Sequence, residues 1–249
     1  MRKLSMALLA GVALVGCGID ENQEIVANLQ QAGFPADDIQ VVDGQVYVGN
    51  DAHVTLEASR EMLQAEKGQE QYRTTNLVGT GVSKICVNPT SSFAAYPNLM
   101  TGLDAAIANY NARGLRLTFQ RGGTGCTANI TATTMSGAGG SAGFPSGGLP
   151  YGTINIGTGM SAYSASVNKH VITHELGHCI GFRHSDYYNR AISCGGAVSN
   201  EGASTVGAIL IPGTPSTATV GGSVMNSCFS STSTGNWTSS DIVALDYLY

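Results

Sequence analysis

Apolar residues recur every three or four positions in several stretches of the chain, a spacing that places them on one face of a helix. Between residues 97 and 113, Leu99, Leu103 and Ile107 share such a face, and Gly114 supplies a stop after it. Near the end of the chain, Thr238 and Asp241 have the spacing of a helix cap. Helices are therefore predicted at 22–31, 56–65, 97–113 and 167–180, and from residue 238 to residue 249.

Other stretches alternate apolar and polar residues, which is the pattern of a strand with one buried face. Leu115, Leu117 and Phe119, for example, are separated by single polar residues. Around Asp43 and Gly44 the alternation predicts two strands joined by a turn. Strands are therefore predicted at 39–48 (as a pair), 84–87, 115–119, 128–135 and 153–156, and a glycine-rich loop is predicted at 137–148.

Residues 1–17 have the pattern of an export signal. Arg2 and Lys3 precede an apolar run at 4–15, which ends in small residues before Cys17. The ending Leu-Val-Gly-Cys resembles a bacterial lipobox, in which Cys17 would become the lipidated first residue after cleavage. An ordinary secretory signal with an incidental Cys17 is the alternative. Both interpretations predict export, as an outer-membrane or cell-surface lipoprotein or as a secreted protein.

Charge divides the rest of the chain in two. Residues 18–73 contain 11 acidic and three basic residues, a net charge of −8, whereas residues 74–249 contain six acidic and seven basic ones, a net charge of +1. A length of about 50 residues is marginal for an independent hydrophobic core. We therefore predict that 18–73 is an acidic pro-segment, that the polar residues 65–75 are its linker, and that 74–249 is the main domain.

Composition excludes several classes of protein. The chain has 249 residues, of which 12% are charged, and its net charge of −5 leaves no basic surface for a nucleic-acid backbone. After the N-terminal signal no stretch reaches the roughly 18 apolar residues of a membrane-spanning helix. A hydrophobic content of 43% is enough for one sizeable core, which excludes a disordered chain.

The candidate chemistry is concentrated between residues 174 and 184. His174 and His178 are four positions apart on a predicted helix, so both imidazoles can reach one Zn²⁺ at about 2.0–2.1 Å. Gly181 can take a positive φ, which would end the helix and return the chain so that His184 becomes a third ligand. Three protein ligands leave a fourth position for water, the arrangement of catalytic rather than structural zinc.

Glu175 is placed beside these histidines, where a base can take a proton from zinc-bound water. A structural zinc site remains an alternative, but it would not require an acid at this position. Chance would produce the five fixed positions of the pattern in only about one in 10⁵ such sequences. His170, one turn before His174, is interpreted as a residue behind the ligands or on the surface.

The pattern His-Glu-Leu-Gly-His-Cys-Ile-Gly-Phe-Arg-His resembles the metzincin clan of metallopeptidases. Residues 222–226, Gly-Ser-Val-Met-Asn, resemble the clan's methionine turn, with Met225 beneath the metal. Within the clan the chain is most similar to the bacterial dual-action HEIGH (protease B-like) metallopeptidases, and the likeness covers most of 71–249. Astacin-like members have a metal-binding tyrosine two residues after that methionine; here the position is Ser227, so no tyrosine ligand is expected.

The resemblance implies an α+β, metzincin-like fold: a twisted mixed sheet with the active-site helix, a cleft, and a smaller irregular C-terminal subdomain that ends in a helix. It also implies that the sheet edge above the metal pairs with an extended substrate. Thr153, Ile154, Asn155 and Ile156 are the predicted substrate edge strand, and a plain edge strand is the alternative.

Together these features predict a zinc-dependent endopeptidase with one catalytic Zn²⁺, in which Glu175 passes a proton from the attacking water to the leaving amine. A noncatalytic zinc-binding lipoprotein and a zinc amidase acting on cell-wall peptides are the alternatives. The expected partners are protein or peptide substrates, without nucleic acid, and a membrane only through a lipid at Cys17. We expect a monomer. Calcium sites cannot be read from the sequence.

Two further expectations concern covalent and regulatory contacts. Disulfides are predicted between Cys86 and Cys126 and between Cys179 and Cys194, with free buried thiols as the alternative. Residues 47–51, Tyr-Val-Gly-Asn-Asp, loosely resemble the Phe-x-Gly-Asp motif of astacin-like pro-segments, with one extra residue before the aspartate. Asp51 is therefore the predicted latency ligand, and a solvated turn residue is the alternative.

Overall fold

The computed structural model describes residues 20–63, 72–202 and 208–249. The predicted export signal with Cys17 and most of the predicted linker lie outside these residues. No helix within the described ranges is long and apolar enough to cross a membrane.

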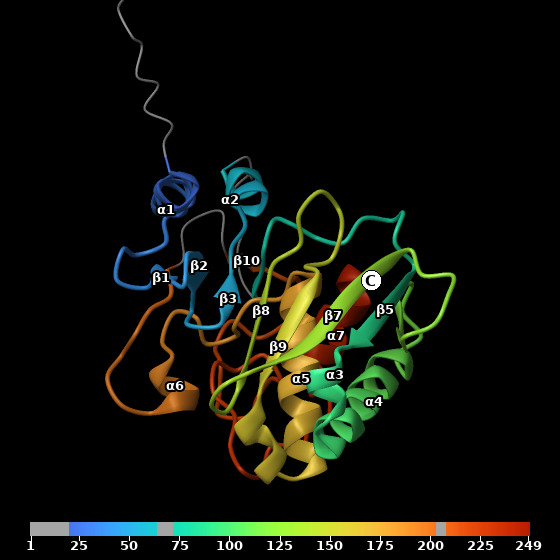
Figure 1. Cartoon of the computed structure of the whole chain (residues 1–249). Coiled ribbons are helices and arrows are strands. Elements are labelled where there is room, and N and C mark those ends of the chain that lie inside the picture. Colours follow the sequence, from blue (N-terminus) through green and yellow to red (C-terminus); the bar gives the residue numbers. More distant parts are fainter. Residues whose placement is uncertain (1–19, 64–71, 203–207) are drawn as a thin grey trace, which may run out of the picture.

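An eight-stranded mixed sheet crosses the molecule in the order β1-β2-β3-β8-β9-β7-β5-β6 (Figure 1). Its strands are β1 (Gln40–Val42), β2 (Gln45–Val48), β3 (Ala52–His53), β5 (Lys84–Pro89), β6 (Thr118–Arg121), β7 (Ala128–Met135), β8 (Gly140–Gly143) and β9 (Thr153–Gly157). Strands β6, β5, β7 and β9 are parallel, and β8 runs antiparallel to β9. The first three strands come from the acidic segment, and β3 joins the others by pairing in parallel with β8.

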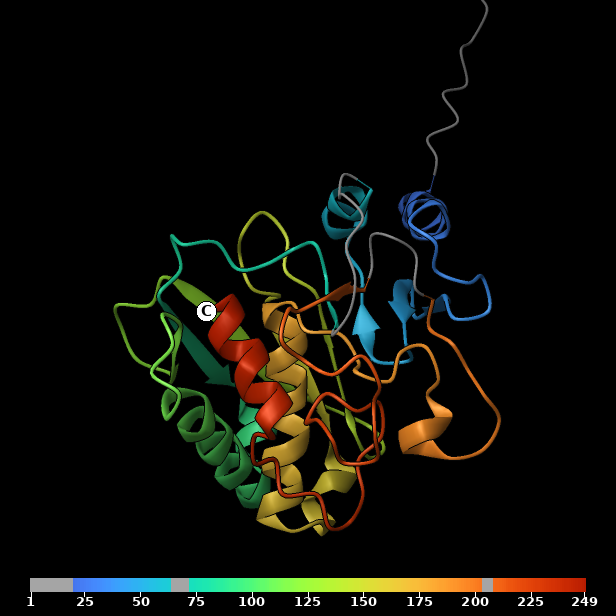
Figure 2. The same cartoon turned by 180° about the vertical axis from the view of Figure 1, so that it is seen from behind.

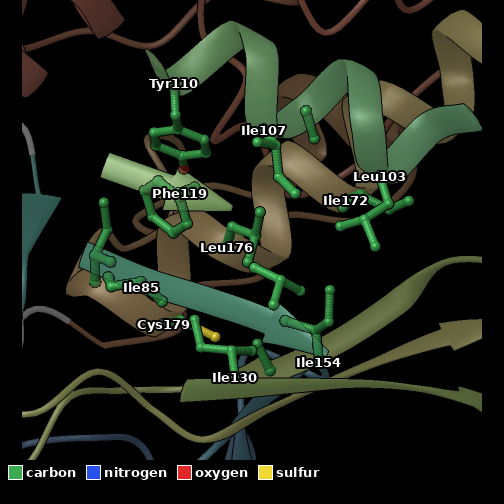
Figure 3. Packing of buried hydrophobic residues seen from close by; sticks show 14 of the residues in the cluster. Ile85, Leu103, Ile107, Tyr110, Phe119, Ile130, Ile154, Ile172, Leu176 and Cys179 are labelled. Atoms are coloured by element: carbon green, nitrogen blue, oxygen red, sulfur yellow. The ribbon is translucent and has the colours of Figure 1, made fainter. Parts of the chain in front are cut away.

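Helices α4 (Pro97–Asn111), α5 (Ala165–Ile180) and α7 (Ser239–Leu248) lie together on one face of the sheet (Figures 1 and 2). Leu103 and Ile107 of α4 and Leu176 of α5 pack over Ile85 and Ile130 of the strands, as Figure 3 shows. Burial of such a face is worth about 1.5–3 kcal/mol for each large apolar side chain. This packing fixes α5 against the sheet.

Apart from α1, which has 11 residues, the remaining elements are shorter than eight residues. They are α1 (Glu21–Gln31), α2 (Leu56–Met62), β4 (Tyr72–Arg73), α3 (Ser91–Ala94), the 3₁₀ helix η1 (Thr158–Ala162), α6 (Ala191–Cys194) and β10 (Ile209–Leu210), which pairs with β4. Helices α1 and α2 pack with β2 and β3 in a second hydrophobic cluster of the acidic segment, and Phe144 of the main domain completes it. The acidic segment therefore has a small core of its own that rests on the main domain.

The predicted α+β fold class is confirmed, with helix α5 against a mixed sheet and an irregular region before the last helix. The capping box of Thr238 and Asp241 begins α7 as predicted. The loop expected at 137–148 is only partly a loop, because it contains β8. The predicted substrate edge strand, Thr153, Ile154, Asn155 and Ile156, is wrong as an edge, since β9 is paired with β7 on one side and with β8 on the other.

One of the two predicted disulfides is confirmed. Cys86 of β5 is bonded to Cys126, with Cα atoms 5.7 Å apart. The predicted pair Cys179–Cys194 is wrong: Cys194 is bonded to Cys228, and Cys179 is the free cysteine among those described. Cys179 lies on the face of α5 that packs onto the sheet near Ile130 (Figure 3), so its thiol is buried in the core.

Candidate active site

Helix α5 places two histidines of the candidate site on one side, one turn apart. The helix begins after Ser164, whose side chain accepts a hydrogen bond from Val167 N. His174 and His178 are 6% and 1% exposed. Because residues 170–180 of the helix are all buried, both imidazoles are held by a rigid element.

Gly181 ends α5 in the left-handed conformation, with φ 110°. A Cβ atom at this position would lie 2.7 Å from the Asn76 carbonyl oxygen, so both the backbone angle and the available space require glycine. The chain turns after it and brings His184, which is 2% exposed, back to the two helical histidines.

The three imidazoles converge through their Nε2 atoms. These lie 3.0 Å apart for His178 and His174, 3.2 Å for His174 and His184, and 3.3 Å for His178 and His184. Ligands at about 2.0–2.1 Å from a tetrahedral metal are separated by about 3.3–3.4 Å. The spacing of the nitrogens therefore fits a single metal ion such as zinc.

The other ring nitrogens are held by hydrogen-bond acceptors. Nδ1 of His174 lies 2.9 Å from Val224 O, and Nδ1 of His178 lies 2.8 Å from Phe182 O. Burial and the neighbouring His184 lower the pKa of His174 to about 4, and burial lowers that of His178 well below its usual value. When each ring is neutral and carries its proton on Nδ1, the lone pair of Nε2 is free to bind a metal at the point where the Nε2 atoms converge.

Asp51 of the acidic segment lies against this cluster. Its Oδ2 is 3.1 Å from His184 Nε2 and 3.9 Å from His174 Nε2. Burial acts to raise the pKa of Asp51, but contact with His184 outweighs it and the pKa is lowered. The Oδ1 atom is buried and has no hydrogen-bond partner among the described residues. One donor atom from Asp51 and one from each histidine lie within 4.8 Å of one another, a set that could hold a metal ion.

A tight turn directs Asp51 into the site. Gly49 and Asn50 both have positive φ, 64° and 70°. Gly49 N donates to the Asp38 carboxylate at 3.0 Å, and Ala142 N of β8 donates to Asp51 O at 3.0 Å. The aspartate is thus held by backbone contacts on both sides of the turn.

Glu175 lies beside the histidines and is 2% exposed. Its Oε2 atom is buried without a hydrogen-bond partner in the described part of the chain. Burial and the charge of Asp51 raise the pKa of Glu175 well above its usual value. The side chain packs against Gly140 of β8, where a Cβ atom would lie only 2.4 Å from Oε1. This placement suits a group that exchanges protons with a molecule in the cleft.

Met225 lies under α5, and a Cβ atom on Gly177 would be 2.6 Å from its sulfur. Ser185 N donates to Met225 O at 2.8 Å, which joins the turn to the residue after His184. The turn itself is held by Asp241 of α7, which accepts hydrogen bonds from Ser223 Oγ and Val224 N. The predicted methionine turn therefore lies directly beside the histidines.

Ser227 and His170 lie near the site without joining the cluster of donors. The Ser227 hydroxyl donates to Asp186 at 2.7 Å, and its oxygen lies 3.3 Å from Glu201 Oε1. His170 is 8% exposed. It lines a cavity of about 200 Å³, whose other walls include Asp51, Glu175 and Phe229.

Glu201 is the residue of this site that the sequence did not indicate. It follows His184 by 17 positions, belongs to no recognisable motif, and is 1% exposed. Its Oε1 lies 2.6 Å from His184 Nδ1. The available signal was its charge, since it is one of only six acidic residues after position 73.

Comparison with known proteins gives a family match over most of the chain. The model of the dual-action HEIGH metallopeptidase family matches residues 46–249. No curated protein shows significant similarity. Two solved structures of myroilysin are similar to parts of the chain: one has 20% identity over 45% of this chain and 55% of its own, with a TM-score of 0.34, and the other 17% over 49% and 53%, with 0.33. The chain thus spans about half the length of these two proteins.

Proposed function

This chain belongs to the dual-action HEIGH metallopeptidase family, and we propose that it is a zinc-dependent endopeptidase whose metal ligands are His174, His178 and His184. The observation that carries this proposal is the convergence of three buried Nε2 atoms at 3.0–3.3 Å from one another, with each Nδ1 held by an acceptor. Histidine nitrogens at this spacing favour zinc, which prefers nitrogen and sulfur ligands in tetrahedral geometry.

Glu175 is the proposed general base and acid. Zinc bound here would act as a Lewis acid that polarises the peptide carbonyl and makes water a nucleophile at neutral pH. The Glu175 carboxylate would take a proton from the attacking water and then donate it to the leaving amine. Burial and the charge of Asp51 raise the pKa of Glu175, which favours the protonated form that donates to the leaving amine.

The substrate would pair with β8 rather than with β9. Within residues 74–249 the sheet has two edge strands, β6 and β8, and β8 is the one beside Glu175, through Gly140. An extended peptide can add to such an edge by backbone hydrogen bonds. Protein or peptide substrates therefore remain the proposed partners.

The edge of β8 is occupied in this structure by β3 of the acidic segment. Ala52 pairs with Ala142 and His53 with Gly143, immediately after Asp51 reaches the histidines. The same short stretch thus covers both the substrate edge and a donor position of the metal site. We infer that residues 18–73 are a pro-segment and that the full chain is a latent precursor of the domain at 74–249.

Two disulfides fit an exported protein, because disulfides persist in oxidising compartments. Export by the N-terminal signal and a lipid anchor at Cys17 remain proposals.

The test of this function is a comparison of the processed chain with Glu175→Ala and Glu175→Gln variants. We expect all three to bind one equivalent of zinc, and both variants to lose at least about 10²–10⁴-fold in kcat on peptides, since general acid–base catalysis contributes that much. Zinc would be measured by metal analysis and turnover by peptide cleavage. If the protein is a noncatalytic zinc protein, the unmodified chain will cleave no peptide. If it is a cell-wall amidase, it will cleave only cell-wall peptides. Near-normal activity of Glu175→Ala would refute the role of Glu175 as the base.

A further inference from the structure

The third histidine of the site is held differently from the other two. His174 and His178 are bonded at Nδ1 by the backbone carbonyls of Val224 and Phe182. His184 follows the end of α5, and its Nδ1 faces a carboxylate instead, with Glu201 Oε1 at 2.6 Å. A loop residue lacks the support that a helix gives, so its orientation depends more on the side chain that holds it.

Glu201 is itself fixed by several contacts. Its backbone N donates to Tyr187 O at 2.7 Å. Its carboxylate pairs with Arg183 Nη2 at 3.2 Å and with Arg190 Nε at 3.3 Å, and Ser227 Oγ lies 3.3 Å from it. A carboxylate that is 1% exposed and surrounded in this way has little freedom to turn. It can therefore transmit a fixed position to the ring that it contacts.

We propose that Glu201 is the positioning residue for His184: it accepts the Nδ1–H hydrogen bond and so turns Nε2 toward the other two histidines. This inference rests on the proposed zinc site. A bond from an imidazole to a carboxylate fixes the ring and strengthens it as a ligand, and loss of such a partner typically weakens metal binding by about 10–100-fold. Glu201 acts only through His184 and does not contact the reacting atoms.

Glu201 and the two arginines that pair with it also contact the acidic segment. Arg190 Nη1 donates to Gly49 O at 2.7 Å, and a Cβ atom on Gly49 would lie 3.0 Å from the Glu201 carboxylate. Arg183 lies over the Phe34 ring at 4.8 Å. Glu201 therefore lies between the third histidine and the turn that carries Asp51, and variants must be compared within the same full chain.

The experiment measures zinc affinity by chelator competition in the full chain, for the unmodified protein, Glu201→Gln and Glu201→Ala. Glutamine keeps an acceptor oxygen for His184, whereas alanine removes it. We expect the dissociation constant of zinc to rise about 10–100-fold in Glu201→Ala and less in Glu201→Gln. The Co²⁺-substituted Glu201→Ala protein should show an altered visible spectrum, which reports a change in ligand geometry.

Glu24→Ala is the control, because Glu24 also pairs with an arginine, Arg60, but on the surface of the acidic segment. Its zinc affinity should be unchanged. Thermal unfolding of the metal-free proteins separates a general loss of stability from a change at the site. If Glu201→Ala does not fold, the zinc affinity of Glu201→Gln, compared with that of the unmodified chain, tests the inference. Equal zinc affinity of Glu201→Ala and the unmodified chain, or Glu201→Gln no tighter than Glu201→Ala, would overturn the inference. An unmodified chain that binds no zinc would instead overturn the proposed function.

Discussion

The Glu175 carboxylate owes its place to the absence of a side chain in another element. A Cβ atom on Gly140 would lie 2.4 Å from Glu175 Oε1 and 2.7 Å from its Cγ. We predict that Gly140→Ala displaces Glu175 and lowers kcat by about 10²-fold, the cost of a misplacement of roughly 1 Å. Zinc content should not change. Gly152→Ala is the matched control, since a Cβ atom there meets nothing within 4 Å. Equal loss of kcat in both variants would show that the contact at Gly140 has no special role.

The spacing of residues predicted which histidines could converge, but it could not predict what holds them. His174, His178 and His184 follow from helix geometry and one glycine, all within 11 positions. Glu201 reaches His184 only because a loop returns through residues 185–201, and no periodic pattern encodes that return. Asp51 was suggested by a loose motif, and its approach to 3.1 Å from His184 depends on a turn with two positive φ angles.

At the scale of elements, the end of α5 decides where the third histidine lies. Gly181 has φ 110°, and alanine in a left-handed conformation costs about 1–2 kcal/mol. A Cβ atom would also lie 2.7 Å from Asn76 O. We predict that Gly181→Ala lowers the free energy of unfolding by more than this backbone cost and weakens zinc binding, because the turn that places His184 must shift. Chemical denaturation and chelator competition would measure the two effects.

Gly114→Ala is a control for the backbone cost alone. Gly114 follows α4 with φ 68°, and a Cβ atom there meets nothing within 4 Å. It should lose about 1–2 kcal/mol of stability and keep its zinc affinity. If Gly181→Ala behaved in the same way, the helix end would not control the position of His184.

The longest elements were predicted well from sequence, whereas the strand expected at 115–119 lies at 118–121 and β8 was not predicted. A long element with one buried face needs a long periodic pattern of apolar residues, which can be read from the sequence. Such patterns are present in the strand at 128–135 and in the helices at 97–111 and 165–180. Strand β8 has only four residues, two of them glycines, so its pairing comes from neighbouring strands rather than from its own side chains. For the same reason β9 was taken for the edge of the sheet.

At the scale of the whole molecule, the acidic segment and the main domain share one sheet. Strands β1, β2 and β3 extend it beyond β8, yet their apolar residues form a separate cluster with α1 and α2. Contact with the candidate site is concentrated at residues 49–53, through Arg190, the histidines and β8. Further contacts join the rest of the segment to the main domain, among them Phe144 in its hydrophobic cluster and the bond between His53 and Tyr151, so cleavage in the predicted linker must be followed by separation of these contacts before the segment is released.

The proposed latency would have two separable contributions from these contacts, and Asp51→Ala distinguishes them. The variant removes the carboxylate oxygen, which at about 2.0–2.2 Å is a competent zinc ligand, but it leaves β3 on β8. We predict that the Asp51→Ala precursor binds a small hydroxamate at the metal and cleaves short peptides before processing, whereas full activity on proteins appears only after cleavage between about residues 65 and 75 and release of the segment. Asp43→Ala, at an exposed turn of the same segment, should stay inactive until processing. Calorimetry with the hydroxamate and peptide cleavage would measure both steps. An Asp51→Ala precursor that binds the hydroxamate no better than the unmodified precursor would assign latency to the strand alone.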